Sequence, residues 1–348
     1  MSDPRLTRLG VVALLLYVSL QGLAAAEERM TAEDIATLTA PAPLARLSYG
    51  PHALQFGHLR LPARPGPHPV VVFIHGGCWL AEYDLLHAEA LMHALATAGF
   101  AVWSVEYRRV GDEGGGWPNT YRDVGLGIDH VRTLARTHEI DLERVVVAGH
   151  SAGGALALWS AARARMPEHS ALYMDDPLPV AAVVALAPAA DLEAVERRKG
   201  TCGEALNALM DGTAREHPAR YAWASPMGLA PIDVPQVLVL GRFDAAWTPP
   251  ALAYRYRAIT TGSERLRVIE LPESGHFEMI DPSKPAWPLV LAAFHAAFAM
   301  AAMPEPANGA GDKRDAATDA ETDVAPEASG PTDDLNDTSA PPEEPVAP

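Results

Sequence analysis

A serine set between glycines is the residue of this sequence whose surroundings point most directly to chemistry. Residues 149–153 read Gly-His-Ser-Ala-Gly and follow the apolar run Val145–Val147. This order predicts a buried strand, a sharp turn that carries Ser151, and the start of a helix. We expect glycines there because the turn is strained and neighbouring chains pass too close for side chains. The helix N-terminus would favour a developing negative charge, as attack on a carbonyl requires.

Two later residues have the types and positions that a nucleophilic serine needs. Such a serine requires a base, and the base requires a carboxylate to orient it. Asp244 follows the apolar run Val237–Leu240, and His276 follows the run Arg267–Leu271. The carboxyl ends of parallel strands meet at one edge of a sheet, where the turn with Ser151 should also lie. The sequence therefore predicts a Ser151, Asp244 and His276 triad.

Other residues near these positions are weaker candidates. Asp233 precedes its strand and should lie at the opposite edge of the sheet, and Asp281 follows the predicted base in the chain. His150 is next to the serine, and we expect its side chain to point away from the reacting centre.

A glycine pair after an earlier strand predicts a site for the oxyanion. Residues 75–79 read His-Gly-Gly-Cys-Trp and follow the apolar run Val70–Ile74. Acyl transfer needs backbone N–H donors that stabilise the tetrahedral oxyanion, and glycines let the backbone approach the substrate closely. We expect these donors at Gly77, Cys78 and Ala152. Weaker candidates for substrate contact are His75, Gly76, Trp79, Trp117 and Trp223. Of these, we expect His75 to brace the loop rather than to take part in catalysis.

Apolar runs that alternate with helical patterns are expected to position these residues. The fold class that they predict is α/β, with a mostly parallel central sheet and helices on both faces. A hairpin is expected over 47–62, and a small cap insertion over about 191–231 interrupts the pattern. Strands are expected at 70–74, 101–107, 145–147, 180–186, 237–240 and 267–271, and helices at 85–98, 121–138, 251–260 and 287–300.

The two ends of the chain differ from the part between them. Residues 1–26 have a positive start, an apolar run and Ala24-Ala25-Ala26, which is typical of a cleaved signal peptide and predicts export to the periplasm or the medium. No membrane span is expected after cleavage. Residues 304–348 carry 12 Asp and Glu against 2 Lys and Arg and are rich in proline, so we expect a disordered acidic tail. The domain between them spans 27–303.

Composition excludes several partner classes. The formal net charge of −17 argues against nucleic acid, which a basic face would bind. No cysteine or histidine spacing matches a metal site, so we expect neither metal nor cofactor.

Cys78 and Cys202 are too few for a disulfide scaffold. An exported protein could join them in one bridge, and two unpaired buried thiols fit the sequence equally well.

The motifs resemble those of a known superfamily. From about 47 to 300 the chain resembles serine hydrolases of the α/β-hydrolase superfamily, and H-G-G-x-W with G-H-S-A-G-G resembles its esterase/lipase branch near arylformamidases and hormone-sensitive-lipase-like esterases. Tyr107 to Arg109 and Gly114 to Pro118 are similar to esterases and prolyl-oligopeptidase-like hydrolases. The resemblance implies the same triad and ester hydrolysis through an acyl-enzyme, although Cys78 stands where the lipase-like group has a third glycine.

The expected substrate is a small or medium carboxylic ester, in a pocket shaped by aromatic side chains. Arylformamidase activity uses the same triad, but it normally serves intracellular tryptophan breakdown, so the export signal counts against it. Peptidase activity has no preceding propeller domain to support it. A binding protein on this fold would be expected to lack a triad member, and none is missing.

Overall fold

An eight-stranded sheet forms the centre of the part of the chain that the structure describes. The computed structural model describes residues 29–198, 200–260 and 265–303. The strand order is β1-β2-β4-β3-β5-β6-β7-β8; β2 is antiparallel to both neighbours, and the later pairs are parallel. The strands are β1 (Ala45–Ser48), β2 (Phe56–Arg60), β3 (His68–Ile74), β4 (Ala101–Val105), β5 (Ile140–His150), β6 (Ala182–Leu186), β7 (Gln236–Gly241) and β8 (Leu266–Leu271).

The central strands are apolar throughout because both faces of the sheet are covered. Every residue of β3 is buried. Val71 and Phe73 pack into one apolar cluster, while Val70 and Val72 pack into another on the opposite face. Strands with this pattern are those of a parallel sheet between two helical layers. The expected fold class is therefore confirmed.

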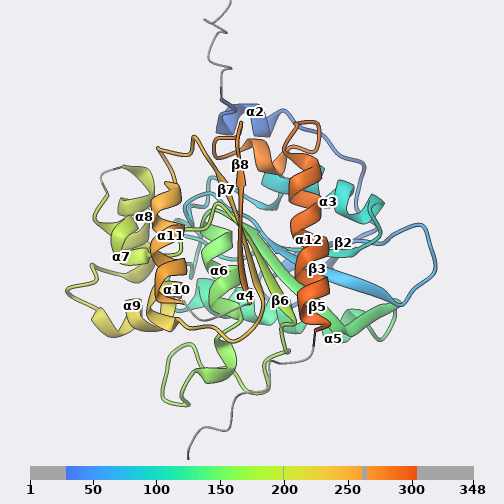
Figure 1. Cartoon of the computed structure of the whole chain (residues 1–348). Coiled ribbons are helices and arrows are strands. Elements are labelled where there is room, and N and C mark those ends of the chain that lie inside the picture. Colours follow the sequence, from blue (N-terminus) through green and yellow to red (C-terminus); the bar gives the residue numbers. More distant parts are fainter. Residues whose placement is uncertain (1–28, 199, 261–264, 304–348) are drawn as a thin grey trace, which may run out of the picture. The chain divides into compact units, whose positions relative to one another are not determined.

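Helices cover the two faces in separate layers. Figure 1 shows α12 on one side of the strands and α6 and α11 on the other. On the first face lie α3 (Glu89–Thr97) and α12 (Trp287–Ala301); on the second lie α4 (Asn119–Asp129), α5 (Val131–Leu134), α6 (Ala152–Ser160) and α11 (Pro250–Ile259). Short 3₁₀ turns are η1 (Leu85–Ala88), η2 (Arg163–Arg165) and η3 (Glu278–Ile280).

One expected helix is two helices in the structure. The predicted helix over 121–138 breaks at His130, where α4 ends and α5 begins. Val124, Ile128, Val131 and Leu134 are all buried, so the apolar spacing continues across the break. The periodicity alone therefore does not reveal where the helix stops.

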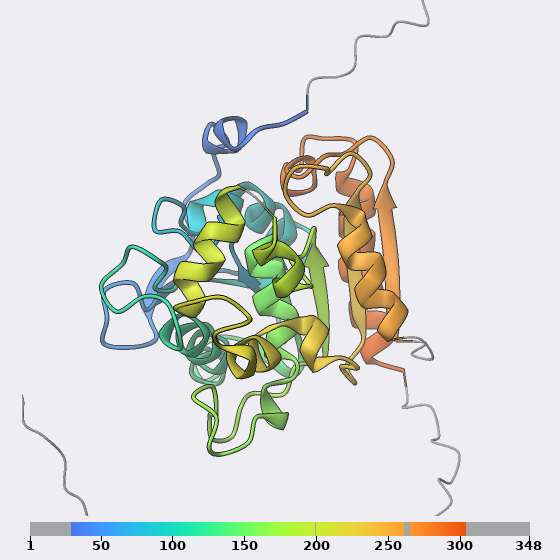
Figure 2. The ribbon, with the colours of Figure 1, turned by 90° about the vertical axis from the view of Figure 1, so that its left-hand side faces the viewer.

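The expected cap insertion over 191–231 is helical. Asp191 caps its first helix by accepting the N–H of Ala194 at 2.9 Å. Figure 2 shows these helices in front of α6, on the face that α6 covers. They are α7 (Leu192–Glu196), α8 (Thr201–Met210), α9 (Pro218–Ala224) and α10 (Pro226–Leu229).

The N-terminal segment begins with a short helix. In α2 (Ala32–Ala36), Thr31 and Asp34 form a reciprocal capping box, and Ile35 is buried in a core cluster. The predicted signal peptide over 1–26 and the predicted acidic tail over 304–348 lie outside the described residues and stay predictions. Within the described ranges, no helix combines the length and apolar character needed to cross a membrane.

Candidate active site

Ser151 lies on the sharp turn between β5 and α6, and its backbone is strained. Its φ is 57° and its ψ is −117°, a region of backbone angles that residues other than glycine rarely adopt. A Cβ on Gly149 would lie 2.2 Å from the carbonyl oxygen of Gly153, and a Cβ on Gly153 would lie 2.1 Å from that of Ile74. The prediction that neighbouring chains leave no room for side chains around this serine is confirmed.

Asp244 and His276 meet in the loops after β7 and β8. Oδ2 of Asp244 lies 2.6 Å from Nδ1 of His276, and Thr248 donates its hydroxyl to the same oxygen at 2.7 Å. Burial alone would raise the pKa of Asp244, but the hydrogen bond and charge of His276 and the bonds from Thr248 lower it below its usual value. The aspartate is therefore ionised, and it orients the imidazole with Nδ1–H toward itself.

A cavity of about 650 Å³ lies beside the serine turn, the loop that carries His276 and the loop that follows β3. Ser151, His276, Gly77 and Cys78 all line it. Its volume is that of a site for a small organic molecule. One wall comes from the N-terminal segment, where ten residues between 32 and 43 face the cavity. That segment carried no chemical signal in the sequence.

The loop His75–Trp79 is the second strained stretch of backbone at this cavity. The φ angles of Gly77, Cys78 and Trp79 are 104°, 50° and 59°. Among the hydrogen bonds of the described residues, none uses the N–H of Gly77 or Cys78. These donors and that of Ala152, at the start of α6, are available to an oxyanion.

His75 contacts the protein rather than the cavity. Its ring is buried, with Nδ1 2.8 Å from the carbonyl oxygen of Gly76 and Nε2 3.0 Å from Glu106. Tyr107 stacks on the ring and donates its hydroxyl to the carbonyl oxygen of His75 at 2.9 Å. These are the contacts of a residue that braces the loop.

Glu106 is a supporting residue that the sequence analysis did not identify. It also pairs with Arg109 at 3.2 Å and accepts the N–H of Leu85 at 3.1 Å. Burial alone would raise its pKa, but His75 and Arg109 lower it below the usual value. Its position directly after β4 is the only sequence signal that could have pointed to it.

The sulfurs of Cys78 and Cys202 are bonded to each other. The sequence left this pairing open, because nothing in it places α8 beside the loop after β3. The bridge joins the candidate oxyanion loop to the inserted helices.

The expectation that His150 points away from the reacting centre is wrong. Along β5, Val146, Ala148 and His150 share a face, since side chains alternate, and the loop carrying His276 crosses that face. Nε2 of His150 lies 2.9 Å from the carbonyl oxygen of His276, so this nitrogen carries the proton and donates.

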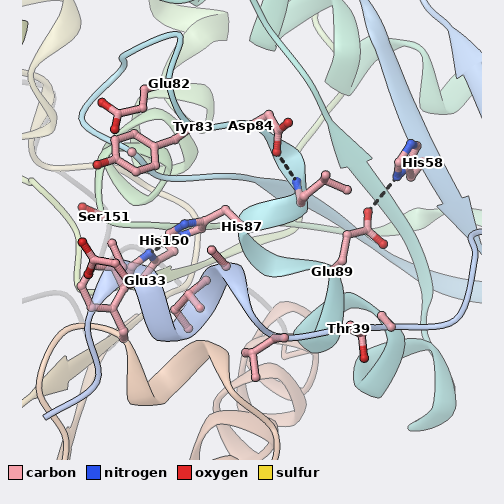
Figure 3. A pocket seen from close by; sticks show the side chains of 18 of the residues that line it. Glu33, Thr39, His58, Glu82, Tyr83, Asp84, His87, Glu89, His150 and Ser151 are labelled. Atoms are coloured by element: carbon pink, nitrogen blue, oxygen red, sulfur yellow. Dashed lines mark hydrogen bonds and ion pairs between the residues drawn. The ribbon is translucent and has the colours of Figure 1, made fainter.

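His87 extends this contact toward the cavity, as Figure 3 shows. Its Nε2 lies 2.8 Å from Nδ1 of His150, which accepts because the other ring nitrogen donates. Burial, with smaller contributions from His75 and His276, lowers the pKa of His87 to about 3. Burial, then the charges of His276 and His87, hold the pKa of His150 well below its usual value. Both rings are neutral at pH 7.

The aromatic residues expected to contact substrate lie elsewhere. Trp79 is buried in the core, and Trp117 and Trp223 pack against the same core at the inserted helices. None of them, nor His75 or Gly76, is among the residues that line the cavity; Trp247 is, and its ring stacks on His276 at 5.6 Å between centroids. The inserted helices likewise contribute no residue to the lining of this cavity.

A buried ion cluster lies at the other end of the cavity. Figure 3 shows Glu89 and His58 there, away from Ser151. Glu89 pairs with Nδ1 of His58 at 2.8 Å and with the guanidinium of Arg60. In the described part of the chain no group of three or more His, Cys, Asp or Glu residues is arranged to hold a metal ion.

A protein-family model matches the part of the chain that carries most of these residues. The BD-FAE family model matches residues 59–247, which is more than half of the chain. The chain belongs to the BD-FAE family. The matched segment contains the candidate oxyanion loop, the serine turn and the aspartate, but ends before His276.

An individual esterase is also similar to part of this chain. Esterase LipC of Mycobacterium tuberculosis (strain ATCC 25618 / H37Rv) is 26% identical over 224 residues, which are 63% of this chain and 55% of that protein. The chain thus spans about half the length of this curated relative.

Solved structures share the fold. Esterase B from Lactobacillus rhamnosis (HN001) has a TM-score of 0.64 and 18% identity, covering 86% of this chain and 97% of that one. A bifunctional GH43-CE protein of Bacteroides eggerthii has a TM-score of 0.62 and 22% identity, covering 74% of this chain and 38% of that one. These likenesses, with the mostly parallel sheet, show the α/β-hydrolase fold that the sequence predicted.

Proposed function

We propose that this BD-FAE family member is a serine carboxylesterase. The observation that carries the proposal is the hydrogen bond between Asp244 and His276 beside the cavity that holds the strained Ser151. The similarity to a protein named as an esterase supports ester rather than formamide or peptide hydrolysis. No feature of the described residues favours arylformamidase or peptidase activity, or a binding protein that has lost its chemistry.

The proposed reaction follows from the protonation states. His276 accepts the Ser151 proton on Nε2 while ionised Asp244 stabilises the imidazolium that forms. The serine oxygen attacks the ester carbonyl, and the N–H groups of Gly77, Cys78 and Ala152 bind the oxyanion. His276 then protonates the leaving alcohol, and water hydrolyses the acyl-enzyme by the same route.

Charge in the cavity bears on which esters are accepted. The lining carries four carboxylates and only one guanidinium. Glu33 and Glu82 lie on the Ser151 side in Figure 3, whereas the guanidinium of Arg60 is already paired with Glu89. A free carboxylate on the substrate would be repelled, so the proposed substrates are neutral esters with small or medium acyl groups.

A substrate panel with one variant tests the proposal. Residues 27–348 should hydrolyse p-nitrophenyl acetate and butyrate, with at least a ~10³-fold loss in Ser151→Ala. The corresponding hemisuccinate ester should be slower by roughly fivefold or more in kcat/KM, as one repelling charge at about 1 kcal/mol implies. N-formylkynurenine should be a poor substrate. Faster turnover of the formamide, or unchanged ester turnover in Ser151→Ala, would overturn the assignment.

We also propose that the protein is exported. The predicted signal peptide suggested this, and the bridge between Cys78 and Cys202 supports it, because disulfides persist in oxidising compartments. The full-length chain expressed in a bacterium should yield a periplasmic or secreted protein whose N-terminus is at or near Glu27. Unprocessed protein confined to the cytosol would contradict the proposal.

A further inference from the structure

The backbone of the loop after β3 adopts a conformation that its residues do not favour. Three consecutive residues, Gly77, Cys78 and Trp79, have positive φ angles. Glycine adopts such angles freely, but a residue with a Cβ does so only where its surroundings hold it there. Contacts with the rest of the protein must therefore hold Cys78 and Trp79 in this conformation.

The neighbours of Cys78 in the loop are held by packing. The side chain of Trp79 is buried in the core, and its carbonyl oxygen accepts the N–H of Val110 at 2.8 Å. On the other side, a Cβ at Gly76 would lie 2.8 Å from the carbonyl oxygen of His150, and one at Gly77 would lie 2.3 Å from Cβ of Tyr83. The chain is thus confined before and after Cys78.

Cys78 itself is attached through its sulfur. Its partner, Cys202, lies in the first turn of α8. This helix is firmly anchored, because Leu206 and Leu209 are fully buried and the carbonyl oxygen of Leu209 accepts the N–H of Trp117 at 2.7 Å. The bridge therefore ties an oxyanion-loop residue to a fixed point outside the loop.

We propose that Cys202 is a positioning residue for the oxyanion site: its bond to Cys78 holds the Cys78 backbone, and hence its N–H, in the left-handed conformation that Cys78 has beside the cavity. A non-glycine residue stands in the loop at a position suited to glycine, and the bridge supplies the restraint that makes this conformation stable. Cys202 touches no substrate in this role. The inference rests on the proposed esterase function of the same site.

This role differs from general stabilisation of the fold. A bridge that only stabilises the protein would lower the melting temperature when removed but leave kcat of the folded enzyme unchanged. A bridge that positions the donor would lower kcat as well, because an oxyanion donor acts mainly in the transition state. Restoring the conformational freedom of residue 78 should then recover kcat without restoring stability.

Three variants that all lack the bridge separate the two roles. Cys202→Ser and the double variant Cys78→Ser/Cys202→Ser keep a Cβ at residue 78. The double variant Cys78→Gly/Cys202→Ser removes that Cβ and lets residue 78 adopt φ near 50° without strain. Each is compared with the wild type for kcat and KM on p-nitrophenyl butyrate, melting temperature, and free thiols in denaturant.

The expected result is a split between activity and stability. The wild type should show no free thiol, and all three variants should melt at lower temperature. The two variants with a Cβ should lose about tenfold in kcat, or ~1.4 kcal/mol in activation free energy, with KM changed by less than about twofold. The glycine variant should recover to within about threefold of the wild-type kcat.

Several results would overturn the proposal. These are two free thiols in the wild type, equal kcat in all three variants, or failure of all three to fold, since the assigned role is local. If the wild type hydrolyses none of the esters, the labelling rate of Ser151 by a fluorophosphonate replaces kcat. That rate depends on the same backbone donors but on no particular ester, so failure of the proposed substrate class is distinguished from failure of this inference.

Discussion

Two strained loops line the candidate site, and different forces hold them. In the serine turn, Ser151 is the strained residue, and the glycines around it allow backbone to lie against backbone. In the loop after β3, Cys78 and Trp79 are strained, and distant side chains fix them through a disulfide and core packing. The first loop depends on side chains that are absent, and the second on partners far away in the chain.

This difference determines what a substitution does at each place. Adding one carbon to a glycine of the serine turn would place it in space that backbone atoms occupy. These backbone atoms can move aside only at a high cost in free energy. Removing a partner of the other loop leaves its backbone intact but less confined. The serine turn should therefore fail abruptly, whereas the oxyanion loop should lose function by degrees.

Among substitutions that test this difference between the two loops, the largest effect is expected for Gly153→Ala. The new Cβ would lie 2.1 Å from the carbonyl oxygen of Ile74, so we expect destabilisation by ~3 kcal/mol or more and at least a ~100-fold loss of kcat. Gly154→Ala is the matched control. Its Cβ would lie 3.1 Å from Pro188, and the change should cost less than about 1 kcal/mol. Urea unfolding measures both, and equal effects would show that backbone contact does not set the glycine requirement.

An intermediate effect is expected for Glu106→Gln. The carboxylate accepts from His75, Arg109 and backbone N–H groups at once, and an amide cannot replace all of these contacts. We expect destabilisation by ~2 kcal/mol and a roughly tenfold lower kcat, because the brace of the oxyanion loop weakens. The exposed Glu113→Gln should change stability by less than ~0.5 kcal/mol. A wild-type kcat in Glu106→Gln would show that Glu106 does not support the oxyanion loop.

The smallest effect at pH 7 is expected for His87, which contacts the serine turn through His150 and whose titration changes stability only at acid pH. Its pKa of about 3 in the folded protein is below the ~6.5 of an unfolded histidine, so the unfolded state binds the extra proton between these values. The stability that the neutral ring contributes is complete above pH ~6.5 and is lost as the pH falls toward 3.

His87→Gln should therefore flatten the acid side of the stability profile. Unfolding free energies measured in urea between pH 7 and pH 4 should fall less steeply in the variant, by at most about 1.4 kcal/mol per pH unit. His295→Gln, on α12 outside the cavity lining, is the control for exchanging a histidine for glutamine elsewhere in the fold. Parallel profiles for His87→Gln and the wild type would mean that this ring stays protonatable in the folded state.

The same contrast explains what the sequence could predict. The strands and the hairpin were predictable because their apolar runs are local, and β3, β6 and β7 end within about two residues of the expected limits. The strain at the serine turn was predictable because glycines within two residues of Ser151 indicate a tight turn. Asp244 and His276 were found from their places after strands, which fixes the edge of the sheet that they share.

The remaining features depend on contacts between distant parts of the chain. Nothing near Cys78 indicates that α8 lies beside it, and nothing near Glu106 indicates that His75 reaches it. The cavity wall from residues 32–43 lacks any periodic or chemical pattern, and aromatic residues such as Trp223 attracted the prediction instead. Aromatic type indicates burial as readily as ligand contact, and only the folded chain separates the two.

Trapping a covalent adduct tests most directly whether Ser151 is the nucleophile at this site. The protein is treated with a p-nitrophenyl alkylphosphonate until ester hydrolysis stops, and the modified residue is mapped by peptide mass spectrometry. We predict one adduct per chain, on the peptide that contains Ser151, with no labelling of Ser151→Ala. Complete inactivation with the adduct on another residue, or continued ester turnover by protein fully labelled at Ser151, would contradict the assignment.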